Sequence, residues 1–224
     1  LKIGDGIPVD KIEAAKYYKM AADKGNPQAM NSYGFMLFKG EGIPMNKEEG
    51  FKYYKMAADK GYILAINNVT LLLTKGDDDI ELNIEEAIKY YKLGCKLGDT
   101  DSMFYYAQML YNGEGIVANK QLAAFYYKMA ADKGKVTAIV KYANMIRDGD
   151  GVDINKEEAE KYYKIGIEKG NDDAMYNYAL MLSKDDLNPT NKLEAIKYMK
   201  MAHNNLNPKA RLSYFSLEHR CSIC

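Results

Sequence analysis

The chain has 224 residues, with 31 Lys and Arg balanced by 31 Asp and Glu, and 47% of its residues are hydrophobic. Zero net charge argues against a nucleic-acid-binding domain, which usually carries a basic excess on one face, and this apolar content excludes a disordered chain. No apolar run approaches the roughly 18–20 residues of a membrane-spanning helix, and three cysteines cannot build a disulfide framework, so we expect a reducing, cytoplasmic location.

A pair of tyrosines recurs along the chain at intervals of 36 residues, with a single interval of 37. The surrounding phrase is repeated as well, since KYYKMAADKG occupies residues 16–25 and again 52–61. Such self-similarity indicates a tandem array in which each copy is one supersecondary unit. The six copies of the pair are Tyr17-Tyr18, Tyr53-Tyr54, Tyr90-Tyr91, Tyr126-Tyr127, Tyr162-Tyr163 and the altered Tyr198-Met199.

The first predicted element of each unit, helix B, carries the tyrosine pair. It begins after an Asp or Asn, and in five of six copies a Glu follows three residues later. This spacing predicts a capping box, in which the Asx oxygen accepts a backbone N–H and the Glu returns to the N–H of the cap residue. Each helix B ends at a glycine, which favours the left-handed conformation. The openings are Asp10, Asn46, Asn83, Asn119, Asn155 and Asn191, and the closing glycines are Gly25, Gly61, Gly98, Gly134 and Gly170.

The second predicted element, helix A, follows each closing glycine within a few residues. Counted from that glycine, positions +4, +8, +9 and +12 form an apolar stripe of helical period, as in Ala29, Tyr33, Gly34 and Leu37. A further glycine ends the helix and opens a turn, and the third turn, 76–83, is one residue longer than the others.

The chain is therefore interpreted as a single array over residues 1–210. It comprises a leading helix B, five A–B pairs and a degenerate final helix A that starts near residue 207. Leu206 replaces the glycine expected before that last helix. Residues 211–224 are expected to form a degenerate cap or a flexible C-terminal tail, because terminal repeats are often atypical.

This pattern closely resembles the Sel-1-like repeat family, whose members are relatives of the tetratricopeptide repeat. The resemblance rests on the Ala-x-x-x-Tyr-Gly/Ala of helix A, on Gly40-Glu41-Gly42-Ile43 with Asn46, and on Tyr53-Tyr54-Lys55-Met56-Ala57-Ala58 with Gly61. It implies an all-α fold: a right-handed superhelical solenoid of tandem antiparallel helix pairs, with about six units of 36 residues. It also implies a non-enzymatic scaffold or adaptor that binds proteins, an inference that rests on fold-level analogy.

A partner-binding surface is predicted on helix A, where positions +3, +6, +10 and +13 vary freely and share one face. In tetratricopeptide-like arrays the corresponding face lines a concave groove, and aromatic rings mixed with amides suit a peptide or helix. The alternative is that these side chains contact neighbouring helices or water. The predicted residues are Asn31, Phe35, Phe38, Asn67, Leu71, Phe104, Gln108, Tyr111, Asn144, Arg147, Tyr176 and Leu180, with Phe104, Tyr111 and Tyr176 as the first candidate anchors.

No motif predicts a catalytic, cofactor-binding or metal-binding residue. The Gly-x-Gly turns lack the third glycine of a nucleotide loop, and His203 and His219 have no legible nucleophile–base partners, which disfavours a hydrolase. The alternative function is a regulatory or targeting arm of a longer protein, such as a membrane-associated quality-control adaptor or a kinase-attached module. Because the chain starts at Leu1 rather than Met, we expect sequence upstream, and Cys221 carries a weak prenylation signal.

Overall fold

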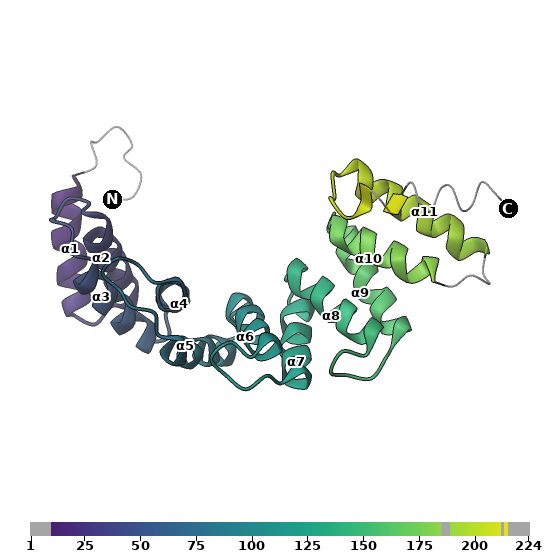
Figure 1. The fold of residues 1–224 in the computed structure, drawn as a ribbon. Coiled ribbons are helices and arrows are strands. Elements are labelled where there is room, and N and C mark those ends of the chain that lie inside the picture. Colours follow the sequence, from purple (N-terminus) through teal and green to yellow (C-terminus); the bar gives the residue numbers. More distant parts are fainter. Residues whose placement is uncertain (1–9, 185–188, 212, 215–224) are drawn as a thin grey trace. The chain divides into compact units, whose positions relative to one another are not determined.

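A computed structural model describes residues 10–184, 189–211 and 213–214 of the chain (Figure 1). These residues form helices joined by short turns, without a named strand. The prediction of an all-α fold is therefore confirmed for the described part. The helices are α1 (Lys11–Asp23), α2 (Pro27–Lys39), α3 (Lys47–Asp59), α4 (Ile63–Lys75), α5 (Ile84–Lys96), α6 (Thr100–Asn112), α7 (Lys120–Asp132), α8 (Val136–Asp148), α9 (Lys156–Glu168), α10 (Asp172–Ser183) and α11 (Pro189–Asn204).

The chain forms two compact units, and each is a solenoid of helix pairs. The first unit contains the described residues up to Met109 together with Gly113–Val117, and the second contains Leu110–Asn112 and the described residues from Ala118 onward. In the first unit α1 packs on α2, α2 on α3, α3 on α4 and α4 on α5, and in the second unit the same succession runs from α7 to α11. Odd-numbered helices are the predicted helix B and even-numbered helices the predicted helix A. Because short turns join neighbours that lie side by side, successive helices run antiparallel.

Five of the six predicted starts of helix B are confirmed, with N-caps at Asp10, Asn46, Asn83, Asn119 and Asn155. The sixth is wrong, because α11 begins at Pro189 and Asn191 lies inside it. Asn46 Oδ1 accepts the backbone N–H of Glu49 at 3.0 Å, and Asn155 Oδ1 accepts that of Glu158 at 2.9 Å. The second half of the predicted capping box is wrong, because the backbone N–H of Asn46 donates to the carbonyl oxygen of Leu37 at 2.9 Å. The preceding helix A thus already satisfies the group that the Glu was expected to reach.

The glutamates freed in this way join neighbouring repeats instead. Glu86 Oε1 lies 2.5 Å from Lys55 Nζ, and Glu158 Oε1 lies 2.7 Å from Lys128 Nζ, in each case across thirty or so residues of chain. These are partly exposed pairs, each worth up to about 1 kcal/mol. Each pair joins a lysine of one helix B to a glutamate of the next helix B, and so favours the correct register between adjacent copies.

The two tyrosines of the repeated pair have different roles. The second one is core: Tyr54, Tyr91, Tyr127 and Tyr163 are all buried. In two copies the first one bridges repeats through its hydroxyl: Tyr90 donates to Asp59 Oδ1 at 2.9 Å, and Tyr162 donates to Asp132 Oδ1 at 2.5 Å. In these copies the pair fills the interior of one repeat and connects it to the previous one.

The degenerate final repeat keeps the backbone of the others at its entrance. Leu206 has φ +64°, the only positive φ of a non-glycine residue in the described chain, and it lies where earlier repeats have glycine. Asn207 then caps the following turn, because its Oδ1 accepts the backbone N–H of Ala210 at 3.2 Å. Residues 210–211 and 213–214 are helical, and the assignment of this segment as a final helix A stays a prediction. The tail with Cys221 and His219 lies outside the described residues.

Replacing Leu206 with glycine is expected to raise the free energy of unfolding by about 1 kcal/mol. Glycine adopts the left-handed conformation without a Cβ penalty, and the Leu206 side chain is 87% exposed, so little packing is lost. Urea denaturation followed by circular dichroism measures the change. As a control, Leu193→Gly at an exposed position inside α11 should instead destabilise by about 1 kcal/mol. Destabilisation by Leu206→Gly would contradict the assignment of strain to this residue.

Candidate peptide-binding groove

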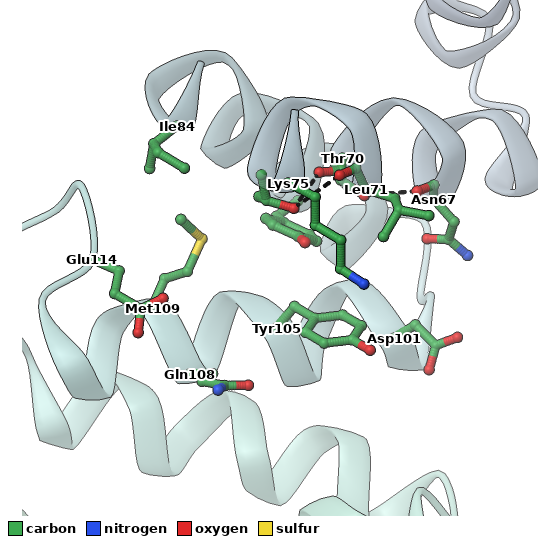
Figure 2. Close-up of a pocket in the computed structure, with 12 residues that line it drawn as sticks. Asn67, Thr70, Leu71, Lys75, Ile84, Asp101, Tyr105, Gln108, Met109 and Glu114 are labelled. Atoms are coloured by element: carbon green, nitrogen blue, oxygen red, sulfur yellow. Dashed lines mark hydrogen bonds between the residues drawn. The ribbon is translucent and has the colours of Figure 1, made fainter. Parts of the chain in front are cut away.

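The first unit contains a groove of about 490 Å³ between helices α4 and α6 (Figure 2). Figure 2 shows Leu71 and Lys75 reaching from α4 towards Tyr105 on α6. Both helices are helix A copies, and five lining residues occupy the variable positions of helix A: Asn67, Leu71, Thr74, Asp101 and Gln108. The lining residues are Asn67, Thr70, Leu71, Thr74, Lys75, Ile84, Tyr91, Asp101, Tyr105, Gln108, Met109 and Glu114.

Two apolar side chains remain accessible in the groove. Leu71 is 48% exposed and Tyr105 is 47% exposed. The Tyr105 ring is held in place from below, with its centroid 6.0 Å from that of buried Tyr91 and 5.4 Å from that of Phe104. A ring that is fixed before binding loses little side-chain entropy on contact with a partner. Leu71 and Tyr105 are therefore suitable anchor positions.

Amide groups flank these anchors. Within the described residues, the side chains of Asn67 and Gln108 make no hydrogen bond with another residue, so their donors and acceptors are available to a peptide backbone. The two threonines of the lining are different, because the Thr70 hydroxyl donates to the carbonyl oxygen of Asn67 at 3.1 Å and that of Thr74 to the carbonyl oxygen of Thr70 at 2.7 Å. The groove thus combines apolar contact area with unused amides.

Deep in the groove, Tyr91 is kept neutral. Burial raises the pKa of the Tyr91 hydroxyl, while hydrogen bonding by Thr70 and Thr74 acts in the opposite direction. A neutral phenol below the anchors contributes packing and hydrogen bonding rather than charge. The charges of the lining lie on Lys75, Asp101 and Glu114.

Three of the predicted residues in the first unit, Asn67, Leu71 and Gln108, line this groove together. Phe104 lies beside it, in ring contact with Tyr105. Tyr105 itself is missing from the predicted set, because its position in the repeat was not one of the four that vary freely.

The other three predicted residues of the first unit lie on α2. The amide of Asn31 accepts a hydrogen bond from Asn68 Nδ2 at 3.0 Å. Phe38 is half-buried, with its ring centroid 6.2 Å from that of Tyr54, whereas Phe35 is exposed. Of these three, Phe35 offers the most accessible apolar surface.

In the second unit, Asn144 and Arg147 belong to an internal polar cluster. The Arg147 guanidinium donates to both carboxylate oxygens of Asp148, at 2.7 and 2.5 Å, and lowers the pKa of that carboxyl group. It also donates to the Tyr163 hydroxyl at 3.0 Å, which in turn donates to Asn144 Oδ1 at 2.6 Å. A partner would have to compete with these bonds, so partner binding by Asn144 and Arg147 stays a prediction.

The remaining predicted residues also have intramolecular partners. The Tyr111 hydroxyl donates to the Asp150 carboxylate, and Lys120 Nζ lies 5.0 Å from the Tyr111 ring centroid. Tyr176 and Leu180 are half-buried against a cluster that includes Met199 and Tyr214. The contacts of Tyr111 and Tyr176 match the alternative reading, contact with neighbouring parts of the chain, more closely than a role as free anchors.

Within the part of the chain that the structure describes, the large apolar side chains exposed on copies of helix A all lie in the first unit. Among the described residues they occur on α2, α4 and α6 but not on α8 or α10. Since accessible apolar patches commonly mark interaction surfaces, the first unit is the better candidate for partner binding. These side chains are Phe35, Leu64, Leu71 and Tyr105.

Metal ligands, histidine contacts and helix hydropathy in the described residues concern other classes of function. No group of three or more His, Cys, Asp or Glu there is placed to hold a metal ion. The His203 ring stacks on Tyr214, with centroids 5.3 Å apart. None of the described helices combines the length and apolar character needed to cross a membrane.

Comparison with known proteins gives a consistent result. A family model described as Sel1 repeat matches residues 2–26, 27–62, 63–99, 100–135, 136–171 and 172–202. The fold is similar to that of a protective antigen of uropathogenic Escherichia coli strains that displays an SLR fold, with 22% identity, a TM-score of 0.87, and coverage of 96% of this chain and 46% of that one. It is also similar to a Sel1 repeat protein from Oxalobacter formigenes, with 25% identity, a TM-score of 0.71, and coverage of 92% and 87%. The chain spans less than half the length of the first of these structures, and among curated proteins none matches the sequence.

Proposed function

This chain belongs to the Sel1 repeat family, and on that premise we propose that it is a non-enzymatic scaffold that binds a peptide or helix of a partner protein in the groove between α4 and α6. Sel1 repeat proteins are generally protein-interaction scaffolds, and the family is typically non-catalytic. The observation that carries the proposal is the pairing of exposed Leu71 and Tyr105 across the groove, with free amides beside them.

The chemistry of the groove favours a peptide over a small polar ligand. Leu71 and Tyr105 offer apolar area for one or two large side chains of a partner, the kind of contact that dominates binding energy in protein interfaces. Asn67 and Gln108 can donate to and accept from a main chain that lies between the helices.

Replacing Leu71 or Tyr105 with alanine is expected to weaken peptide binding about tenfold or more, as truncation of an anchor usually does. Peptides can be selected on the wild-type chain from a phage-displayed random library, and their dissociation constants measured by fluorescence anisotropy. Because both side chains are about half exposed, the free energy of unfolding should change by less than about 0.5 kcal/mol.

The matched control uses two exposed side chains on helix α7 of the second unit. Leu122→Ala and Phe125→Ala remove similar apolar groups outside the groove and should leave peptide affinity unchanged. If the selected peptides respond to the α7 substitutions and not to those at Leu71 and Tyr105, the proposed groove is wrong.

A further inference from the structure

A second cavity of the first unit, of about 590 Å³, lies between α3 and the segment that leads into α5. It shares no lining residue with the groove between α4 and α6. We refer to it as the acidic cavity. Its lining residues are Glu48, Phe51, Lys52, Lys55, Met56, Asp59, Leu73, Asp79, Ile80, Glu81, Leu82, Asn83 and Glu86.

The floor of the acidic cavity is apolar. Leu73 and Ile80 are buried and close its base. Phe51 is half-buried, and Met56 and Leu82 are exposed, with 60% of Leu82 accessible. Exposed large side chains gathered over a buried apolar base offer a partner contact area that water would otherwise cover.

The long third turn shapes one wall of this cavity. The backbone N–H groups of Asp77 and Ile80 donate to each other's carbonyl oxygens at 3.0 and 3.1 Å, which turns Ile80 inward and leaves Glu81 and Leu82 outside. Lys47 Nζ holds the turn from α3 through Asp77 Oδ1, at 2.6 Å. The wall is thus fixed by main-chain and ionic contacts before any partner arrives.

Negative charge predominates around the floor. Five carboxylates and only two lysines line the cavity, in a chain whose overall net charge is zero. Lys55 is already paired with Glu86 at 2.5 Å. Glu48 and Glu81 are exposed and have no ion-pair partner within the described residues.

We propose that the acidic cavity binds a basic amphipathic helix of a partner protein. Leucine-sized side chains of such a helix would cover Phe51, Met56 and Leu82, and its lysines or arginines would meet Glu48 and Glu81. Charge complementarity selects this occupant, because an acidic segment or a nucleic acid would be repelled by the same carboxylates. The proposal is independent of the groove between α4 and α6, because the two sites share no lining residue.

The probe is a synthetic helix-forming peptide with Leu at i and i+4 spacing flanked by Lys, and its twin has every Lys replaced by Glu. The full chain should bind the Lys peptide, in fluorescence anisotropy, and not the Glu twin. Its affinity should fall as salt rises, because exposed charges are screened. Glu48→Gln combined with Glu81→Gln should weaken binding about tenfold, and Leu82→Ala should weaken it by a similar factor.

The repeats supply matched controls in the second unit. Glu157→Gln removes the equivalent charge in the first turn of α9, and Ile154→Ala removes an apolar side chain that is 62% exposed, against 60% for Leu82. Both variants should bind the Lys peptide as the wild type does.

Several results would overturn the proposal. Equal binding of the Glu twin would show that charge does not select the occupant, and equal losses in the control variants would show that the effect is not local. Weakened binding in Leu71→Ala or Tyr105→Ala would place the peptide in the other groove. Self-association in analytical ultracentrifugation that Leu82→Ala abolishes would identify a second copy of the chain as the occupant.

Discussion

Replacing Tyr163 with alanine is expected to lower the free energy of unfolding by about 4 kcal/mol, the cost of deleting a large buried aromatic side chain. Tyr163 is fully buried, and its ring centroid lies 6.2 Å from that of Tyr178. Its hydroxyl also connects Arg147 with Asn144, as described above. The substitution therefore creates a cavity and leaves buried polar groups without their partner.

Tyr163→Phe separates these two contributions. It keeps the ring and removes the hydroxyl, so we expect a loss of about 1–2 kcal/mol. Burial raises the pKa of Tyr163, so the hydroxyl stays protonated and can donate at neutral pH. Urea denaturation of both variants gives the two values. Tyr17→Ala, at an exposed tyrosine of the repeated pair in α1, should cost less than about 0.5 kcal/mol; a similar small loss in Tyr163→Ala would contradict the buried assignment.

Gly50→Ala is expected to destabilise the chain by about 2 kcal/mol, although alanine is the better helix former. A Cβ atom on Gly50 would lie 2.7 Å from the carbonyl oxygen of Gly34 and 3.0 Å from the backbone nitrogen of Phe38. Both are main-chain atoms, which cannot turn aside as a side chain can. The overpacking, typically 1–3 kcal/mol or more, should therefore exceed the gain of up to about 1 kcal/mol in helix propensity.

The shift of the urea midpoint and the crystal structure of the variant would test this expectation. Lys52→Ala, at an exposed position of the same helix, should change the free energy of unfolding by less than about 0.5 kcal/mol. If Gly50→Ala stabilises the chain instead, α2 and α3 can separate at no cost and their close approach is not required by the fold.

The repeat architecture could be predicted because its signals are local. Asn46 and Asn155 cap their helices through a hydrogen bond that depends only on residues three positions away. Closing glycines such as Gly25 and Gly61 have positive φ, as the sequence indicated. The sequence also located the position where the last repeat departs from this rule: Leu206 replaces the expected glycine and still has a positive φ.

Contacts between repeats were harder to predict. The prediction that Glu49 bonds the N–H of Asn46 failed because the carbonyl group of Leu37, on another helix, takes that N–H. A capping rule considers one helix in isolation and cannot include an acceptor that tertiary packing supplies. The ion pair of Glu86 with Lys55 also depends on the packing of one repeat on the next, so a short stretch of sequence does not predict it.

The candidate groove was predicted only in part. Asn67, Leu71 and Gln108 occupy positions that vary between repeats. This variation indicated a helix face that the packing of neighbouring helices does not constrain. Tyr105 lies one position away from that face, and its exposure depends on how α4 sits beside α6. A usable signal existed, because Tyr105 is one of four tyrosines that fall outside the tyrosine positions of the repeat. In a repeat array, aromatic residues outside the aromatic positions of the repeat are therefore candidates for exposed binding residues.

The packing of each helix chiefly on its sequence neighbours has a kinetic consequence. Contacts between residues close in sequence cost little loop-closure entropy, so each unit should fold rapidly and can nucleate at any helix pair. The same arrangement leaves α1 and α11 with a packed neighbour on one side only among the described helices of their units. Amide hydrogen exchange should therefore be fastest at these two helices and slowest at interior ones such as α3 and α9, a gradient that a domain with one central core would not show.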